Sequence, residues 1–297
     1  MQKSVFCAIT GRPNAGKSSL LNALVGEKIA MVSDKSQTTR TKITGILTEG
    51  ELQYVFIDTP GIHKSRNVLG THMNKAVREA VDGIDAVVYM IDITKNINEI
   101  DKQTLARYLQ NDIPVIVGLN KIDLLEEKSA CAAVLTEISS LGDFAALVPV
   151  SVKQKDGIDL IKAEIANFAK EEPHYFPDDK LTDQPEKSLM AEMIREKLLM
   201  LMYDEIPHGI AVVIDKLEER TTKKGEDIME ISAVIYCERE SHKGMIIGKG
   251  GELLKKAGSM ARADLESFFG IKTDLKLWVK VKEDWRSNEQ LVNNFGL

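Results

Sequence analysis

The sequence predicts an α/β domain with a mostly parallel sheet, followed by a smaller α+β domain. Over the first part of the chain, apolar runs rich in Val and Ile alternate with amphipathic helical stretches, which is typical of parallel strands joined by crossover helices. After a proline-containing segment, the order becomes helix, strand, strand, short helix, glycine loop, helix and strand. We therefore place a first domain at 1–170, a linker at 171–187 and a second domain at 188–297.

Five apolar runs carry the strand prediction for the first domain: SVFCAI, YVFID, AVVYMID, PVIVGLN and ALVPVS. Its last helix, GIDLIKAEIANFAK, places Ile158, Ile161, Ile165 and Phe168 on one face. In the second domain, GIAVVIDKLEE and IMEISAVIYCE predict two strands joined by a polar turn. DLKLWVKVK alternates and predicts a third strand.

The composition is that of a globular protein: 297 residues, 43% hydrophobic and 28% charged. The three cysteines are widely spaced in apolar stretches, so we expect reduced thiols, and neither Cys nor His shows metal-ligand spacing. With no signal-peptide pattern and no long apolar run, we expect a cytoplasmic location. The net charge of −6 is shared about equally by the two parts, so any nucleic-acid binding must be local.

A phosphate-binding loop is predicted at GRPNAGKS, which fits GxxxxGKS/T between a strand and a helix. Its backbone N–H groups can cradle phosphate, Lys17 can reach the β and γ phosphates, and Ser18 can ligate Mg²⁺. The predicted contacts from this loop are Gly11, Arg12, Pro13, Asn14, Ala15, Gly16, Lys17, Ser18 and Ser19.

Two further motifs follow strands and complete a nucleotide site. In DTPG, Asp58 can hold Mg²⁺ and the Gly61 N–H can approach the γ-phosphate, and we include Thr59 and Pro60 between them. In NKID, the carboxylate of Asp123 can accept from the ring N–H and the amine of guanine, a pair of donors that adenine lacks. Asp123 thus favours GTP over ATP as the substrate.

The remaining nucleotide contacts are predicted from position. We expect Asn120, Lys121 and Asp123 at one strand end and Ser151, Val152 and Lys153 after the next strand. Between the phosphate loop and DTPG, SDKSQTTRTKITG suits a mobile segment whose hydroxyl joins the Mg²⁺ shell. We choose Thr39 for this role, with Thr38 as the alternative, so the predicted metal ligands are Ser18, Thr39 and Asp58.

The ordered set GRPNAGKS, TTR, DTPG, NKID and SVK resembles the TRAFAC-class GTPases, and GRPNAGKSSLLNAL with QTTRTKITG is most similar to the Era-type branch. Relatives of the Ras type carry a glutamine after DxxG, but here Ile62 stands in that place. An apolar side chain does not polarise water, so we expect slow hydrolysis by the chain alone. The resemblance implies that Asn14 holds a K⁺ ion, which acts where an arginine finger would act in other GTPases. The predicted catalytic set is Lys17, Asn14, Thr39 and Gly61.

The second glycine loop, IIGKGGELL, has two interpretations. GxxG alone is common at the start of a helix, but in this order of elements it resembles a type II KH domain, whose loop clamps an RNA backbone. From Lys243 to Arg262, the sequence has five cations and one anion, Glu252, which gives the region around the loop a local positive charge. The predicted RNA contacts are Lys243, Ile247, Gly248, Lys249, Gly250, Gly251, Lys255, Lys256 and Arg262, with Lys280 and Lys282 as secondary candidates beside Trp278. For those two lysines, we favour solvated residues of an edge strand, with RNA contact beside Trp278 as the alternative.

A GTPase domain followed by one KH domain resembles the Era-type GTPases over nearly the whole chain. The resemblance implies a factor for small ribosomal subunit (30S-type) assembly that binds the 3′ region of small-subunit rRNA, with peripheral membrane association. We expect a monomer that binds RNA in the GTP state and is released after hydrolysis. The alternatives are a GTPase that acts on tRNA or another rRNA site, and an RNA-binding module whose nucleotide site is mainly structural.

Overall fold

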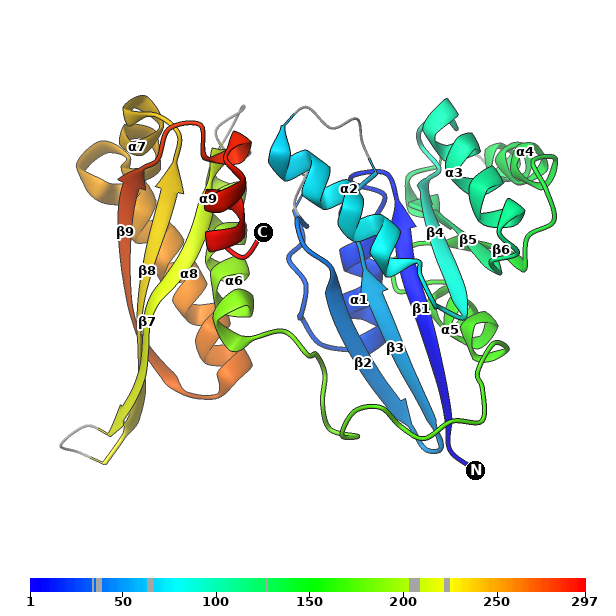
Figure 1. Cartoon of the computed structure of the whole chain (residues 1–297), viewed down its shortest axis with the longest axis horizontal. Coiled ribbons are helices and arrows are strands. Elements are labelled where there is room, and N and C mark those ends of the chain that lie inside the picture. Colours follow the sequence, from blue (N-terminus) through cyan, green and yellow to red (C-terminus); the bar gives the residue numbers. More distant parts are fainter. Residues whose placement is uncertain (34, 36–38, 63–66, 126–127, 203–208, 222–224) are drawn as a thin grey trace. The chain divides into compact units, whose positions relative to one another are not determined.

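The computed structural model describes residues 1–33, 35, 39–62, 67–125, 128–202, 209–221 and 225–297. The chain divides into two compact units, each with its own sheet (Figure 1). The first comprises Met1–Ala30, Thr39–Ser65 and Gly70–Asp183, and the second comprises Met31–Thr38, Arg66–Leu69 and Gln184–Leu297. Within the described residues, no helix has the length and apolar character needed to cross a membrane.

The first unit is built on a six-stranded sheet in the order β2-β3-β1-β4-β5-β6. Only the pairing of β2 with β3 is antiparallel, because β2 and β3 are joined directly while the other connections cross over through helices. The strands are β1 (Lys3–Gly11), β2 (Ile43–Glu49), β3 (Leu52–Asp58), β4 (Ala86–Asp92), β5 (Val115–Asn120) and β6 (Ala146–Val150). The prediction of a mostly parallel sheet is confirmed.

Helices cover both faces of this sheet. They are α1 (Lys17–Val25), α2 (Val68–Ala80), α3 (Glu99–Gln110), α4 (Lys128–Ser139) and α5 (Ile158–Ala166), with a short 3₁₀ turn η1 (Ile122–Leu124). Leu105 of α3 and Ile138 of α4 pack in one core with the β4 and β5 side chains. On the opposite face, Ile161 of α5 lies beside Gly118, and α5 contacts α1.

Strand β2 was not predicted. The sequence suggested one polar, mobile segment that ran as far as Gly45, but Ile43, Thr44 and Gly45 pair with β3. A side chain at position 45 would overlap Leu21, Val25 and Ile29, so only glycine lets the strand pass this close to α1. The turn-like composition of the segment concealed the start of the strand.

Much of the segment predicted as a linker lies along the first unit. The side chain of Gln53 is fully buried and forms four hydrogen bonds. Its Oε1 accepts from the backbone N–H groups of Tyr175 and Phe176, and its Nε2 donates to the Phe176 carbonyl. Farther along, the Ile46 N–H donates to the Leu181 carbonyl. These bonds order the segment against β2 and β3 rather than leave it extended in solvent.

The second unit has a three-stranded sheet in the order β7-β8-β9, with β8 antiparallel to β7 and parallel to β9. Its elements are α6 (Glu186–Leu201), β7 (Ala211–Thr221), β8 (Asp227–Cys237), α7 (Glu240–Ile247), η3 (Lys249–Gly251), α8 (Glu252–Phe269), β9 (Lys272–Val281), η4 (Trp285–Ser287) and α9 (Glu289–Asn294). The order from α6 to β9 is the predicted one. The C-terminal α9 and the buried Trp285 were not predicted.

Helices α6 and α8 pack together over one face of the sheet. The buried ammonium of Lys197 joins them, since it lies 2.9 Å from Glu196 of α6 and 2.5 Å from Asp264 of α8. Because a buried charge is tolerated only when it is paired, this bridge fixes how the two helices pack. The position of α8 in turn fixes the glycine loop that precedes it.

Candidate nucleotide site and candidate RNA-binding surface

The predicted phosphate loop joins the end of β1 to the start of α1. It contains three residues at positive φ: Gly11 at 137°, Asn14 at 63° and Gly16 at 98°. The Lys17 ammonium is buried inside the loop and donates to the carbonyls of Gly11 at 3.1 Å and Arg12 at 2.9 Å. Burial lowers the pKa of Lys17 to about 8, although the nearby Asp58 carboxylate opposes this shift.

The three predicted metal ligands converge. Ser18 Oγ donates to Asp58 Oδ2 at 2.6 Å and lies 2.8 Å from Thr39 Oγ1. Asp58 is fully buried, and burial raises its pKa to about 6, against the opposing effects of Lys17 and Ser18. Its second oxygen, Oδ1, is buried without a hydrogen-bond partner among the described residues. One carboxylate and two hydroxyl groups form an all-oxygen set of the kind that Mg²⁺ prefers. Thr38 lies outside the described residues.

The DTPG segment is held against the phosphate loop. The Thr59 N–H and hydroxyl both donate to the Ile9 carbonyl, at 3.2 and 2.9 Å. A Cβ on Gly61 would lie 2.7 Å from the backbone nitrogen of Pro13, so a larger residue would push the two loops apart. Pro60, between them, is buried.

Ile62 gives the site no polar side chain. Its backbone N–H donates to the Gly11 carbonyl at 3.1 Å. Its side chain packs with the apolar core and lines a groove of about 930 Å³ between α2 and α3, which Val77 of α2 and Tyr108 of α3 also line. The residue after DTPG therefore provides no polar side chain that could orient the attacking water.

The predicted base-binding residues form one network with the phosphate loop. Asn120 Nδ2 donates to the Ala15 carbonyl at 2.9 Å, and Asn120 Oδ1 accepts from the N–H groups of Lys121 and Val152. The Ser151 hydroxyl donates to Asp123 Oδ1 at 2.6 Å, which orients the carboxylate predicted to read guanine. Lys153 is exposed and Ser19 is half-buried.

One partner in this network was missed. Asp92, at the end of β4, lies 2.7 Å from the Lys121 ammonium and 3.5 Å from that of Lys95. A signal was available, because Asp92 ends the run AVVYMID and the carboxyl ends of parallel strands meet at the ligand-binding edge of the sheet. Its role is to hold Lys121, which is at a positive φ of 72°.

The second glycine loop lies between α7 and α8 and is exposed at Lys249 and Gly250. Gly248, Gly250 and Gly251 have φ of 75°, 60° and 82°. A Cβ at Gly248 would lie 2.8 Å from the Leu253 Cβ, whereas at Gly250 or Gly251 it would meet nothing within 4 Å. The middle of the loop is therefore open to a ligand, while Gly248 is needed for packing inside the chain.

Most predicted RNA contacts surround this loop. The exposed cations are Lys249, Lys255, Lys256 and Arg262, while Ile247 is half-buried and Lys243 lies 3.7 Å from Glu240. Lys280 is placed differently. In β9, Leu277 and Val279 pack toward the core under α8, so Lys280 and the 59% exposed Trp278 point from the opposite face of the sheet. Lys282 follows the end of β9 and is exposed.

Comparison with known proteins decides the family. A family model described as a 50S ribosome-binding GTPase matches residues 6–121, and a KH domain model matches residues 205–286. GTPase Era of Clostridioides difficile is 47% identical over 296 residues, which cover 100% of this chain and 99% of the relative. The chain belongs to the Era family of GTPases. GTPase Era of Ruminiclostridium cellulolyticum is 44% identical over 99% of this chain and 97% of its own.

Solved Era structures agree with this assignment. A crystal structure of Era in complex with MgGDPNP and nucleotides 1506–1542 of 16S ribosomal RNA has a TM-score of 0.95 and 35% identity, and the match covers 100% of this chain and 99% of that one. A variant Era of Aquifex aeolicus bound to GDP·AlF₄⁻ also has a TM-score of 0.95 and 35% identity, with 99% of each chain covered. This Era-family chain is thus a GTPase with an RNA-binding KH domain.

Proposed function

We propose that this GTPase binds the 3′ region of small-subunit rRNA while GTP is bound, acts in small ribosomal subunit assembly, and is released after hydrolysis. The convergence of Ser18, Thr39 and Asp58 is the observation that carries the proposal, because Thr39 belongs to the segment that GTP would order. The related Era structure that holds both MgGDPNP and a 16S rRNA segment supports it.

We assign roles to the site as follows. Ser18 and Thr39 would hold Mg²⁺ by their hydroxyl oxygens, and Asp58 by its carboxylate. When bound, the ion neutralises charge between the β and γ phosphates. Lys17 binds the same phosphates, and the Gly61 N–H donates to the γ-phosphate. Asp123 accepts two hydrogen bonds from guanine.

The measurement that tests the switch is RNA affinity in two nucleotide states. We expect the GTP-analogue form to bind an RNA oligonucleotide from the 3′ end of small-subunit rRNA at least about tenfold more tightly than the GDP form, which is a coupling of about 1.4 kcal/mol. The Asp58→Asn variant serves as the control, because it loses the metal carboxylate and should bind RNA equally in both states. Equal affinity for the unmodified protein would favour the RNA-binding module with a structural nucleotide site.

The RNA target needs a separate experiment. Crosslinking the GTP-analogue form to total cellular RNA and sequencing the product should give reads concentrated at the 3′ end of small-subunit rRNA. Reads centred on tRNA or on another rRNA site would leave the GTPase chemistry intact and replace the proposed partner.

Turnover offers a test of the proposed K⁺ site at Asn14. Ile62 supplies no polar group, so a monovalent cation held beside the phosphates would provide the missing charge. We expect GTP hydrolysis to fall by about tenfold or more when K⁺ is replaced by Na⁺ at equal ionic strength, as for loss of a charge-stabilising contact in a transition state. Unchanged turnover would remove Asn14 from the catalytic set.

We further propose a cytoplasmic monomer with peripheral association at the membrane, organised as 1–170, 171–187 and 188–297. Light scattering should give the mass of one chain. A vesicle sedimentation assay with anionic lipid should retain part of the protein, and its complete absence from the pellet would contradict the membrane association.

A further inference from the structure

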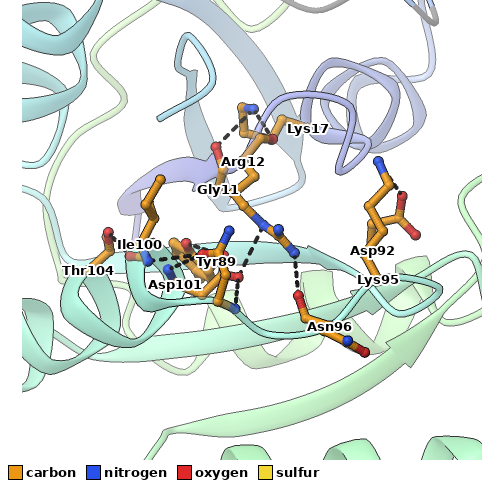
Figure 2. A network of polar contacts seen from close by, with 11 residues as sticks. Gly11, Arg12, Lys17, Tyr89, Asp92, Lys95, Asn96, Ile100, Asp101 and Thr104 are labelled. Carbon is orange, nitrogen blue, oxygen red and sulfur yellow. Dashed lines mark hydrogen bonds and ion pairs between the residues drawn. The ribbon is translucent and has the colours of Figure 1, made fainter. Parts of the chain in front are cut away.

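The side chain of Arg12 is turned away from the phosphate-binding interior of its loop. Its Nε lies 3.1 Å from Asp101 Oδ2, and its Nη2 donates to the Asn96 carbonyl at 3.0 Å (Figure 2). Both partners belong to the start of α3 and the loop before it. The guanidinium therefore ties the phosphate loop to a different part of the first unit.

Asp101 is at the centre of this connection. It is fully buried, forms an ion pair with Arg12, and accepts a hydrogen bond from the Tyr89 hydroxyl at 2.9 Å (Figure 2). It also accepts a hydrogen bond from the Asn98 N–H at 3.0 Å. Burial raises the pKa of Tyr89 and the Asp101 carboxylate raises it further, so Tyr89 stays protonated as a donor. One carboxylate thus connects β4, α3 and the phosphate loop.

Helix capping alone does not explain Asp101. The side chain of Asn98 already caps α3, since it accepts from the N–H groups of Ile100 and Asp101. Asp101 completes the capping box with its bond to the Asn98 N–H, but a cap requires neither a fully buried carboxylate nor an arginine from another loop. The contact with Arg12 therefore indicates a second role for Asp101, besides helix capping.

That role concerns the carbonyl groups that hold Lys17. The Arg12 carbonyl accepts from the Lys17 ammonium, so fixing residue 12 also fixes the lysine. The same loop holds Asn14 at a φ of 63°, in the left-handed region that asparagine adopts more readily than most residues. Asn120 holds the other end of the loop through Ala15, and Arg12 holds this end.

We propose that Asp101 is a positioning residue for GTP binding, which acts through Arg12 to hold the phosphate loop in the form that presents Lys17 to the β-phosphate. The proposal rests on the phosphate role of Lys17. Because GDP and GTP share the β-phosphate, the anchor should affect both nucleotides and should change KM more than kcat.

The experiment measures GDP affinity, KM, kcat and melting temperature for Asp101→Asn, Arg12→Ala and the double variant. Asp101→Asn is nearly isosteric and keeps an acceptor, so it should fold. We expect each single change to weaken GDP binding by about tenfold, as expected for one charge-assisted hydrogen bond, and to raise KM by a similar factor. The double variant should be no weaker than Arg12→Ala, because Asp101 acts through Arg12.

Asn98→Ala is the matched control, since it removes the cap at the same end of α3 without removing the partner of Arg12. It should lower the melting temperature and leave GDP affinity unchanged. If Asp101→Asn also lowers only the melting temperature, or if its effect on affinity adds fully to that of Arg12→Ala, Asp101 is merely structural. A wrong assignment of the phosphate site itself would give a different result: Lys17→Ala would then bind GDP as tightly as the unmodified protein.

Discussion

The two glycine loops open helices in the same way but differ in what surrounds them. A Cβ at Gly11 would overlap the Met90 carbonyl, and at Gly16 it would overlap the Asn120 amide, so the chain itself demands these glycines. At Gly250 and Gly251 nothing lies within 4 Å. The first loop is held by partners inside the protein before any ligand arrives. The second is open, so specificity in the RNA contact proposed there must come from the groups around it and from the RNA.

The largest effect should come from Lys17→Ala, which removes the only ammonium buried in the described part of the first loop. We expect GTP and GDP affinity to fall by about 100-fold or more, as charged hydrogen bonds to phosphate are lost. Isothermal titration measures this directly, with Lys153→Ala at an exposed position for comparison. Retained affinity would show that the phosphates bind elsewhere.

A sharper comparison of the loops uses one substitution at two glycines. Gly16→Ala and Gly251→Ala both place alanine at positive φ, at 98° and 82°, which costs about 1 kcal/mol in each case. Only Gly16→Ala also displaces Asn120, so it should weaken GDP binding by about tenfold or more through the lost bond to Ala15. Gly251→Ala should keep GDP affinity. Equal losses of GDP affinity in both variants would mean that a general loss of stability, rather than the Asn120 contact, accounts for the effect of Gly16→Ala.

The sequence predicted the features that depend on neighbouring residues and missed those that depend on residues far apart in the chain. The site residues Asp58, Asn120 and Asp123 could be predicted because each belongs to a motif at or directly after the end of a predicted strand. Asp101 could not, because it lies 89 positions from Arg12 and forms part of an ordinary helix start. Strand β2 was hidden by a turn-like composition, and the linker is ordered by contacts with distant segments, among them the bonds from the buried Gln53 side chain to Tyr175 and Phe176. Contacts between distant segments leave little trace in local pattern.

Charge at the open loop should have a smaller but specific effect. Gly248→Asp is a poor test, because its Cβ would clash with Leu253 and the fold would suffer. Gly250→Asp avoids the clash, and Gly250→Asn shares its shape and its backbone strain without the charge. We expect RNA affinity to fall by about tenfold more in the Asp variant than in the Asn variant, since its carboxylate would face RNA phosphates if the loop contacts them as proposed. Similar losses in the two would point to strain rather than to phosphate contact.

The smallest effect separates the two groups of predicted RNA lysines. Lys255 lies on α8 beside the open loop, whereas Lys280 points from the opposite face of the sheet. Lys255→Gln should weaken RNA binding by a few fold and lower the slope of log K against log salt by about 1, the change expected for one lost phosphate contact. Lys280→Gln should change neither. If Lys280→Gln lowers the slope as much, RNA extends around the edge of the sheet, and the open loop is one part of a larger surface.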